Sequence, residues 1–450
     1  MPTPLCDALR DYNGSNPVRF HMPGHKGQFL PVPELASASG LDVTELLPTG
    51  NLYEAGAPFD KAQSLWAEQF GFEYCQFLTG GSTMGIHTGL SLLCRPGDRI
   101  LVDRSCHRAV FHAMALLDLE PIYLERPWLQ EENLAGPVSL ETVRKLLDCY
   151  PDIKTICITY PTYAGVLSDV EAIGQFIHSR GGKLFVDGAH GAHLPFLGLS
   201  PYRGADGVVV SAHKTLPALG QSALLFTNGI KPERVRRMAS VFGTSSPSYP
   251  ILASMDGARA WLEGEGGELY KLAALRVAEL RKRYPSLRKG ERLSLDPARF
   301  TLNVQSGPVF AAALEREGIW PEMEDGGHVI FICTPQDLKQ NFDRLEAALE
   351  KNRDQMGACS PIPAPPLPER ALSLRQALFG ETEVLALEQC EGRIAACQLA
   401  PYPPGVPVVA PGERITKKEL SYLKKIGYNK QEVPVILEME RQPGNSGRTR

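Results

Sequence analysis

The chain has 450 residues, of which 43% are hydrophobic and 22% are charged. This length exceeds that of a usual single domain, and the apolar content suffices for a large core, so we expect two or three domains. The formal net charge is only -4, which excludes a strong overall attraction to nucleic acid or to an acidic membrane surface. We therefore expect the ligand to be a small molecule.

The ten cysteines are scattered and none forms a C-x-x-C pair, a usage typical of a reducing compartment and not of a disulfide framework. The N-terminal residues lack a basic segment followed by an apolar run of signal-peptide length, and no later segment approaches the roughly 18 apolar residues of a membrane span. We expect a cytoplasmic protein without membrane contacts.

Residues 1–48 are rich in glycine, proline and polar residues and include RFHMPGHKGQF, which predicts an extended arm that packs on a partner subunit. From about residue 49 the pattern changes to a helix near 60–70 followed by alternating strands and helices. The short apolar runs that predict strands lie at 76–78, 99–102, 122–124, 155–159, 184–186 and 207–210. This alternation indicates a doubly wound, mainly parallel α/β sheet, and we assign it to a large domain over 49–290.

The pattern of apolar and polar residues changes in the second half of the chain. The residues after 248 read as helical, and the charged stretch at 269–282 is typical of a solvated helix face. A mixed pattern over 291–360 predicts a small α+β domain. The proline-rich segment SPIPAPPLPERAL then marks a linker before a C-terminal module at 366–450, which ends in the tail QPGNSGRTR.

Chemistry-bearing residues follow two of the predicted strands. KLFVD ends at Asp187, and GVVVSAHKT delivers Ser211, His213 and Lys214 after the next strand. Ligands of open α/β sheets gather at the carboxyl ends of strands, so these side chains are expected to meet. Lysine is almost never buried without a partner, and one at this position indicates either an anion contact or imine chemistry.

Pyridoxal phosphate requires a lysine for the imine, a carboxylate opposite the pyridinium nitrogen and a cradle for its phosphate. Lys214 and Asp187 supply the first two. The sequence TGGSTMG reads as a glycine-rich loop that opens a helix, where free N–H groups and the helix dipole favour an anion. The predicted phosphate ligands are Gly81, Ser82, Thr83 and the hydroxyl of Ser211.

The order TGGST, DGAHGAH and SAHKT resembles the Orn/Lys/Arg decarboxylase family of fold type I pyridoxal-phosphate enzymes, in a short form without the N-terminal wing domain. The segments FHMPGHKG, DVTELLPTGNLYEAGAP, VDRSCHRAV and EGRIAACQLAPYPPGVPVVAPGERI extend the resemblance over nearly the whole chain. It implies decarboxylation of arginine, lysine or ornithine to the amine and CO2, with pyridoxal phosphate as cofactor. Arginine and lysine are favoured over ornithine on the same ground.

The resemblance also implies roles for further residues. His107 in DRSCHR would stack on the cofactor ring, and His190 in DGAHG would lie near the ring and substrate. Thr244 and Ser245 in GTSSPSY would reach the phosphate of the neighbouring subunit's cofactor. A homodimer or a higher homo-oligomer with sites at the subunit interface is therefore expected.

The substrate contacts that we predict are Glu413, for the distal cation of a basic amino acid, together with Glu54 and His25. Catalysis also needs a proton returned to Cα after CO2 departs, and His213 or the freed amine of Lys214 is placed by sequence to supply it.

Each feature has a simpler interpretation. KLFVD and TGGSTMG could belong to a nucleotide-binding fold, but no G-x-x-x-x-G-K-[ST] is present. His107 beside Cys106 could indicate zinc or a catalytic thiol, but no second ligand pair has metal spacing, so we predict no metal. His25 could organise a turn of the arm, Glu413 could be a solvated carboxylate, and Lys214 could pair with an anion without covalent chemistry.

Two other functions compete. Asp187 and Lys214 would serve an aminotransferase or a lyase of fold type I equally well, and a catalytically idle homologue could bind the cofactor to regulate a partner. The histidine directly before Lys214 and the segment PYPPGVPVVAPGE resemble the decarboxylases and favour that reaction. The presence of Asp187, His213 and Lys214 together argues against the idle homologue.

Overall fold

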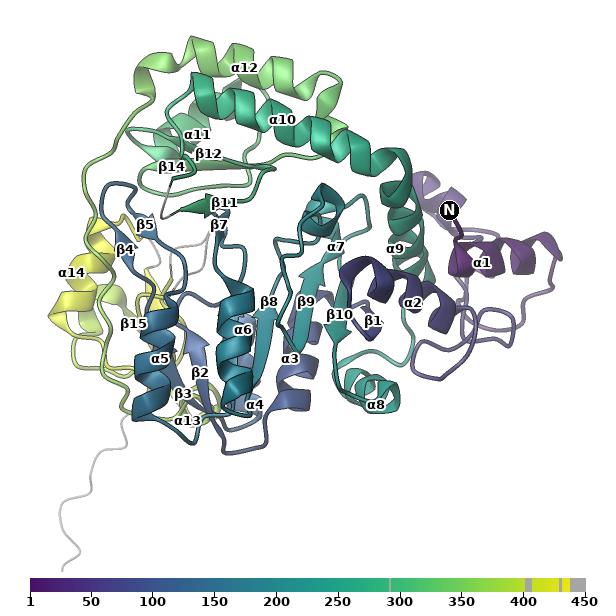
Figure 1. Cartoon of the computed structure of the whole chain (residues 1–450), viewed down its shortest axis with the longest axis horizontal. Helices are drawn as coiled ribbons and strands as arrows, with labels where there is room; N and C mark the ends of the chain where they lie inside the picture. The colour runs from purple at the N-terminus through teal and green to yellow at the C-terminus, as the bar shows by residue number, and fades with distance from the viewer. Residues whose placement is uncertain (291–292, 401–406, 429–430, 438–450) are drawn as a thin grey trace, which may run out of the picture.

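The computed structural model describes the whole chain except residues 291–292, 401–406, 429–430 and 438–450. Its centre is a seven-stranded sheet in the order β1-β10-β9-β8-β6-β2-β3 (Figure 1). The strands are β1 Tyr74–Leu78, β2 Arg99–Asp103, β3 Glu120–Leu124, β6 Thr155–Thr159, β8 Lys183–Asp187, β9 Gly207–Ser211 and β10 Ala223–Thr227. Six of them match the predicted apolar runs. The seventh, β10, lies in the apolar run ALLFT, which we did not predict as a strand.

β10 is also the exception to the parallel order. It pairs antiparallel with both β1 and β9, whereas β9, β8, β6, β2 and β3 are parallel neighbours. The prediction of a mainly parallel sheet is confirmed. A return strand inserted between β1 and β9 brings the end of β1 beside the end of β9, and this arrangement places the TGGST loop next to the segment that carries Lys214.

Two cores sandwich the sheet, because successive residues of each buried strand face opposite sides. On β9, Val208 and Val210 belong to one core and Val209 to the other. The helices of the first core are α2 Phe59–Phe70, α5 Leu140–Cys149, α6 Val170–Ser179 and α9 Tyr249–Trp261. Those of the second are α3 Gly81–Leu93, α4 Arg108–Leu116 and α8 Pro232–Phe242. The doubly wound architecture follows directly from this alternation.

The first residues depart from the prediction of an extended arm. Pro4–Gly14 form helix α1, which buries Leu5 and Leu9 against the large domain. Asp256 of α9 accepts the N–H groups of Leu5 and Cys6 at 2.9 and 3.1 Å. A carboxylate from another helix therefore satisfies the free N-terminal amides that a capping side chain of α1 would otherwise take. The remainder of the arm contains only the short helix η1, Pro33–Ala38.

A small α+β unit stands above the sheet in Figure 1. It contains a three-stranded antiparallel sheet in the order β12-β14-β13. Its elements are α10 Gly267–Arg283, β12 Arg299–Asn303, α11 Gly307–Arg316, β13 Met323–Glu324, β14 His328–Ile332 and α12 Asn341–Lys351. The strand β11, Ser294–Leu295, pairs with β7, Val166–Leu167, of the large domain. The mixture of helices and strands predicted for this region is thus observed. The helices predicted after residue 248 correspond to α9 and α10.

The C-terminal module has a small core of its own. Its elements are α13 Leu374–Phe379, β15 Thr382–Ala386, α14 Lys417–Lys425 and β16 Glu432–Ile436, with β15 and β16 antiparallel. The residues PYPPGV of the family-like segment and the predicted frayed tail QPGNSGRTR lie outside the described residues. Our domain boundaries stay predictions. Among the helices of the described ranges, none is both long and apolar enough to cross a membrane.

Candidate active site

Lys214 lies on the single helical turn α7, Ala212–Thr215, directly after β9. Its Nζ is 3.0 Å from Nε2 of His190 and 5.7 Å from the centre of the Tyr163 ring. Desolvation by burial lowers the pKa of Lys214 below its ordinary value, and the negative charge of Asp187 partly opposes this change. The environment therefore shifts Lys214 toward the uncharged amine, the form that attacks a carbonyl.

Asp187 ends the neighbouring strand β8 and is 2% exposed. One carboxylate oxygen accepts the N–H of Ala189 at 3.2 Å. Burial raises the pKa of Asp187, whereas the positive charge of Lys214 and the Ala189 hydrogen bond lower it. A cationic ring nitrogen in this position would stabilise the charged carboxylate by the same Coulomb attraction.

Two predicted histidines gather around the lysine in neutral form. Burial, followed by the charge of Lys214, lowers the pKa of His190 well below its usual range, so one ring nitrogen stays unprotonated and Nε2 can accept a hydrogen bond from the amine. Burial and then Lys214 lower the pKa of His107 to about 4. His107 caps α4, and its Nδ1 accepts the N–H of Ala109 at 3.2 Å. Both rings are thus uncharged at neutral pH and suited to stacking or hydrogen bonding.

His213 is oriented by the backbone. Its Nδ1 lies 2.8 Å from the carbonyl oxygen of Ser222 and, because a carbonyl only accepts, Nδ1 must donate. This contact leaves Nε2 to take up or release a proton beside Lys214. The proton-transfer role that we predicted for His213 stays a prediction with a compatible geometry.

The predicted phosphate loop needs one correction. The N–H of Gly81 is not free, because it donates to the carbonyl of Gln221 at 2.8 Å. Ser82 and Thr83 stand in the first turn of α3, and within the described residues their N–H groups have no partner. The strand register brings Ser211 to the same place, because Leu78 pairs with Ala223 and Ala223 pairs with Ser211.

Buried hydroxyl groups next to this loop also lack partners. Among the described residues, Oγ of Ser211 and Oγ1 of Thr79 are buried without a hydrogen bond. A buried polar group without a partner costs free energy, on the order of 1–3 kcal/mol, so such atoms commonly mark a place where a ligand or water binds. The loop therefore combines free N–H donors with unsatisfied hydroxyls.

The prediction that Glu413 binds a substrate cation conflicts with its environment. Glu413 is 1% exposed, and its two oxygens each lie 2.8 Å from a guanidinium nitrogen of Arg104. The N–H of Ala410 donates to one of them at 2.7 Å. The carboxylate is already neutralised by a cation of its own chain, and this is the physical reason for the correction.

The other predicted contacts lie apart from the Lys214 cluster or remain untested. His25 bonds to Asp42 at 3.1 Å and accepts the N–H of Gly27, which fits the simpler interpretation that it organises a turn of the arm. Glu54 is exposed, with Asn51 donating to its carboxylate. Thr244 and Ser245 are exposed in the loop between α8 and α9. Their predicted contact with a neighbouring subunit stays a prediction.

Sequence reasoning missed three residues near the lysine. Tyr163 follows β6 and lies against His190, with ring centres 4.1 Å apart, so the rule that ligands meet strand ends could have found it. Arg299 is buried, and its Nη2 lies 3.4 Å from the carbonyl of His190. Glu322 exerts a charge effect that raises the pKa of Lys214. The last two come from the small unit, and no local motif marks them.

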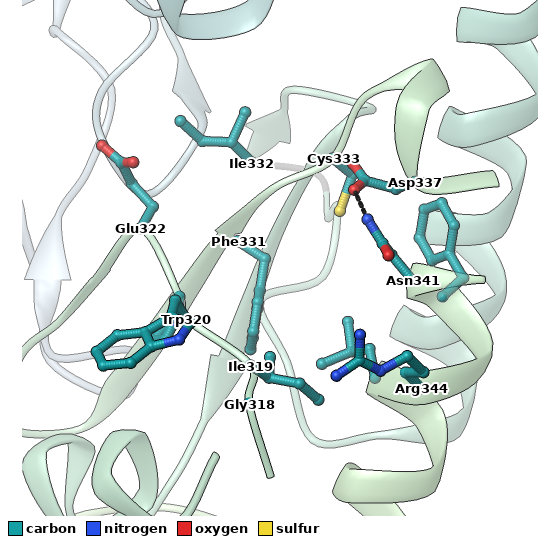
Figure 2. A pocket seen from close by; sticks show the side chains of 13 residues that line it. Gly318, Ile319, Trp320, Glu322, Phe331, Ile332, Cys333, Asp337, Asn341 and Arg344 are labelled. Atoms are coloured by element: carbon teal, nitrogen blue, oxygen red, sulfur yellow. Dashed lines mark hydrogen bonds between the residues drawn. The ribbon is translucent and has the colours of Figure 1, made fainter. Parts of the chain in front are cut away.

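Glu322 is also on the rim of a cavity of about 330 Å³ between the segment before β13, β14 and α12. Figure 2 shows its carboxylate directed away from the other lining side chains, whereas Asn341 bonds to Asp337 within the cavity at 2.8 Å. Within the part of the chain that the structure describes, the Glu322 carboxylate has no hydrogen-bond or ion-pair partner. Over the same residues no group of three His, Cys, Asp or Glu side chains could hold a metal ion.

Comparison with known proteins now identifies the family. A model of the Orn/Lys/Arg decarboxylase major domain matches residues 3–298, and a model of the C-terminal domain matches residues 360–436. The chain belongs to the Orn/Lys/Arg decarboxylase family. It is therefore an amino-acid decarboxylase, and the predicted resemblance is confirmed.

Relatives cover nearly the full length. An arginine decarboxylase of Bacillus subtilis (strain 168) is 32% identical over 94% of this chain and 93% of its own length. An arginine decarboxylase of Bacillus anthracis is 31% identical over 94% and 92%. Among solved structures, the constitutive lysine decarboxylase of Escherichia coli superposes with a TM-score of 0.80 at 21% identity, covering 97% of this chain and 82% of that one. The last similarity confirms the predicted fold.

The family implies pyridoxal phosphate, and the residues at this edge of the sheet fit it. The N–H groups of Ser82 and Thr83 and the hydroxyl of Ser211, which have no partner among the described residues, form a cradle for an anion. Asp187 is the last residue of β8, and Lys214 follows the neighbouring strand β9. The charge of each changes the pKa of the other. The donor set thus includes the three groups that this cofactor needs.

Labelling of Lys214 tests the electrostatics without cofactor. We expect the rate at which an amine-reactive reagent modifies Lys214 in the apoprotein to rise with pH through a midpoint below the ordinary lysine value of about 10.4. Because the charge of Asp187 raises this pKa, Asp187→Asn should lower the midpoint further. Mass spectrometry of the Lys214 peptide measures both. A midpoint at the ordinary value, or a rise in Asp187→Asn, would contradict the assigned environment.

Proposed function

We propose that this protein is a pyridoxal-phosphate-dependent arginine decarboxylase in which Lys214 holds the cofactor. The observation that carries the proposal is the partly buried amine of Lys214, 3.0 Å from His190 and under the charge of Asp187, at the edge where the anion cradle opens. Family membership and the arginine decarboxylases of the two Bacillus species support it.

When bound, pyridoxal phosphate supplies an aldehyde that bonds to the lysine amine and a ring that accepts the electron pair left by departing CO2. Lys214 contributes an amine whose lowered pKa keeps it nucleophilic. Asp187 would keep a ring nitrogen protonated through its buried carboxylate. His107, uncharged because its pKa is about 4, would stack on the ring without adding a competing positive charge.

The same residues account for proton movement. Nε2 of His190 lies 3.0 Å from Nζ of Lys214, so it can accept a hydrogen bond that orients the lysine amine. Nε2 of His213 and Nζ of Lys214 are the two groups that would return a proton to Cα. The Ser222 carbonyl holds the His213 ring by its opposite nitrogen, at 2.8 Å, so Nε2 keeps a constant direction.

Arginine is the substrate that we favour within the family. The relatives at 30–32% identity that carry an activity in their names are arginine decarboxylases, whereas the lysine decarboxylases are 23–24% identical. A guanidinium requires a carboxylate partner. Glu413 is occupied by Arg104, whereas Glu322 is exposed, is unpaired among the described residues, and its negative charge raises the pKa of Lys214. We infer that Glu322 binds the distal cation.

We further propose that the active unit is a homodimer. Apolar side chains of the arm are largely exposed on the single chain, among them Val18 (84%), Phe20 (93%), Phe29 (72%) and Leu47 (98%). Such a concentration of exposed apolar side chains is typical of a surface that a partner covers. A second copy would also bring the exposed Thr244 and Ser245 to the cradle of its neighbour, as the resemblance to the family implies.

Carbon dioxide release decides the reaction. We expect purified protein with added pyridoxal phosphate to release CO2 from arginine at least tenfold faster than from lysine or ornithine, measured as kcat/KM. Lys214→Ala should abolish both release and the visible absorbance of bound cofactor, whereas Lys282→Ala, an exposed lysine on α10, should change neither. Retained absorbance in Lys214→Ala would refute the lysine assignment. Absorbance without CO2 release would indicate an aminotransferase or lyase.

The substrate contact has its own test. Glu322→Gln should raise the KM for arginine about tenfold, with kcat and cofactor affinity nearly unchanged, because it removes the charge that pairs with the guanidinium. Glu315→Gln, which neutralises an exposed carboxylate on α11, is the matched control. Steady-state kinetics with arginine measure both variants. Equal KM values in Glu322→Gln and the control would exclude Glu322 from the substrate site.

The proposed role of the arm in dimerisation is tested by measuring the molecular mass of the protein in solution. Analytical ultracentrifugation should give twice the chain mass of 49.3 kDa for the wild type and a single chain for Phe20→Asp/Leu47→Asp, because two buried charges oppose association. Leu275→Asp, which changes a 60% exposed leucine on α10, should remain dimeric. A wild-type monomer, or a double variant that still dimerises, would contradict the proposal.

A further inference from the structure

An ion pair joins the C-terminal module to the end of a central strand. Arg104 directly follows β2, and its Nη1 and Nη2 donate to the two oxygens of Glu413 at 2.8 Å each. The side chains are 9% and 1% exposed. Arg104 also donates to the carbonyl of Val408 at 3.3 Å, and its guanidinium carbon lies 4.6 Å from the ring centre of Tyr123. The contact is bidentate, stacked and withdrawn from water, which is the geometry of a specific anchor.

Displacement of this ion pair would cost free energy, because further hydrogen bonds hold both partners. Glu413 is held in turn by the N–H of Ala410 at 2.7 Å, and the backbone N–H of Arg104 donates to Leu124 at 2.9 Å. Removal of either charge would leave the other buried and unpaired, which is among the larger single penalties in a protein interior. The position of Arg104 is thus coupled to that of the module.

The anchored segment leads to His107. Three residues after Arg104, His107 caps the N-terminus of α4. The residues between them form a tight turn, in which Asp103 accepts the N–H of Ser105 on its side chain at 2.9 Å and that of Cys106 on its carbonyl at 3.1 Å. A displacement of Arg104 would therefore move His107 relative to the cluster around Lys214.

The module also contacts the far end of the same helix. Arg375 donates to the carbonyls of Ala115 and Leu116, at 3.4 and 3.3 Å, where α4 ends. Leu374 and Ala410 belong to the same core as the buried face of α4. The segment from Arg104 to Leu116 is therefore held by the C-terminal module at both ends.

We propose that the C-terminal module positions His107 for the cofactor ring, and that Glu413 is a positioning residue that acts through Arg104. The proposal rests on the proposed function, because it assigns His107 to the ring. It explains why a domain outside the sheet contributes a buried charge at the carboxyl end of β2. It also accounts for a glutamate that has both oxygens occupied and therefore offers none to a substrate.

Two variants test the anchor. Glu413→Gln removes the charge, and Arg104→Lys keeps it but loses the bidentate, stacked geometry. The matched control is Arg370→Gln, which breaks another ion pair of the module, to Glu120 at 3.1 Å; Glu120 begins β3, whereas the His107 turn follows the carboxyl end of β2. Arg104→Lys also serves if Glu413→Gln does not fold.

The first measurement uses apoprotein. Hydrogen–deuterium exchange of residues 104–111 should accelerate about tenfold or more in both anchor variants and stay at the wild-type rate in Arg370→Gln. The second measures cofactor affinity by absorbance titration, which should weaken about tenfold in the anchor variants while the KM for arginine changes less than twofold.

The outcomes separate the possible roles. An increased KM with wild-type exchange and cofactor affinity would make Glu413 a substrate ligand and overturn the proposal. Unchanged exchange in both anchor variants, or equal acceleration in the control, would overturn it as well. Failure of the wild type to bind pyridoxal phosphate would refute the proposed function alone, because the exchange measurement on apoprotein still decides whether the module holds the His107 segment.

Discussion

The site depends on the partial removal of one lysine amine from water. Burial disfavours the charged forms of Lys214, His190 and His107 and lowers the pKa of each, whereas the negative charge of Asp187 partly opposes this change for the lysine. The charge of Lys214 acts in the same direction as burial on both histidines. The result is a lysine with a lowered pKa, one buried carboxylate and two neutral rings, a combination that suits imine chemistry on a cationic ring.

The scaffold supports this lysine from three directions. The strand β10 brings the cradle loop beside Ser211, and the small unit contributes Arg299 and Glu322 from above the sheet. Tyr270 of α10 donates to the carbonyl of Thr215, next to the lysine, at 2.5 Å. The same ring stacks on His193, whose Nε2 bonds to the buried Asp296 at 2.8 Å. The helix that carries the lysine is therefore braced by α10 through a buried polar network.

Much of the fold could be predicted because its signals are local. Buried strands appear in the sequence as short apolar runs, and the rule that ligands gather at the carboxyl ends of strands predicts that Asp187 and Lys214 lie together. Helix α1 could not be predicted in this way, because it depends on Asp256, which is about 250 residues away and caps it. The prediction that the N–H of Gly81 binds the phosphate was wrong for a similar reason. This N–H donates to the carbonyl of Gln221, which belongs to another loop.

The amino-acid sequence alone indicated the family and the fold class, through motifs that resemble the Orn/Lys/Arg decarboxylases, and it predicted the roles of Lys214 and Asp187, because these residue types follow apolar strands at short spacings. Only the tertiary structure decided which charges are free. Nothing in the sequence distinguishes the carboxylate of Glu413 from that of Glu322. In the structure, Arg104 binds both oxygens of Glu413, whereas Glu322 has no partner among the described residues. The physical reason is that charge pairing and burial depend on distances between segments far apart in the chain, and spacing along the sequence carries no information about those distances.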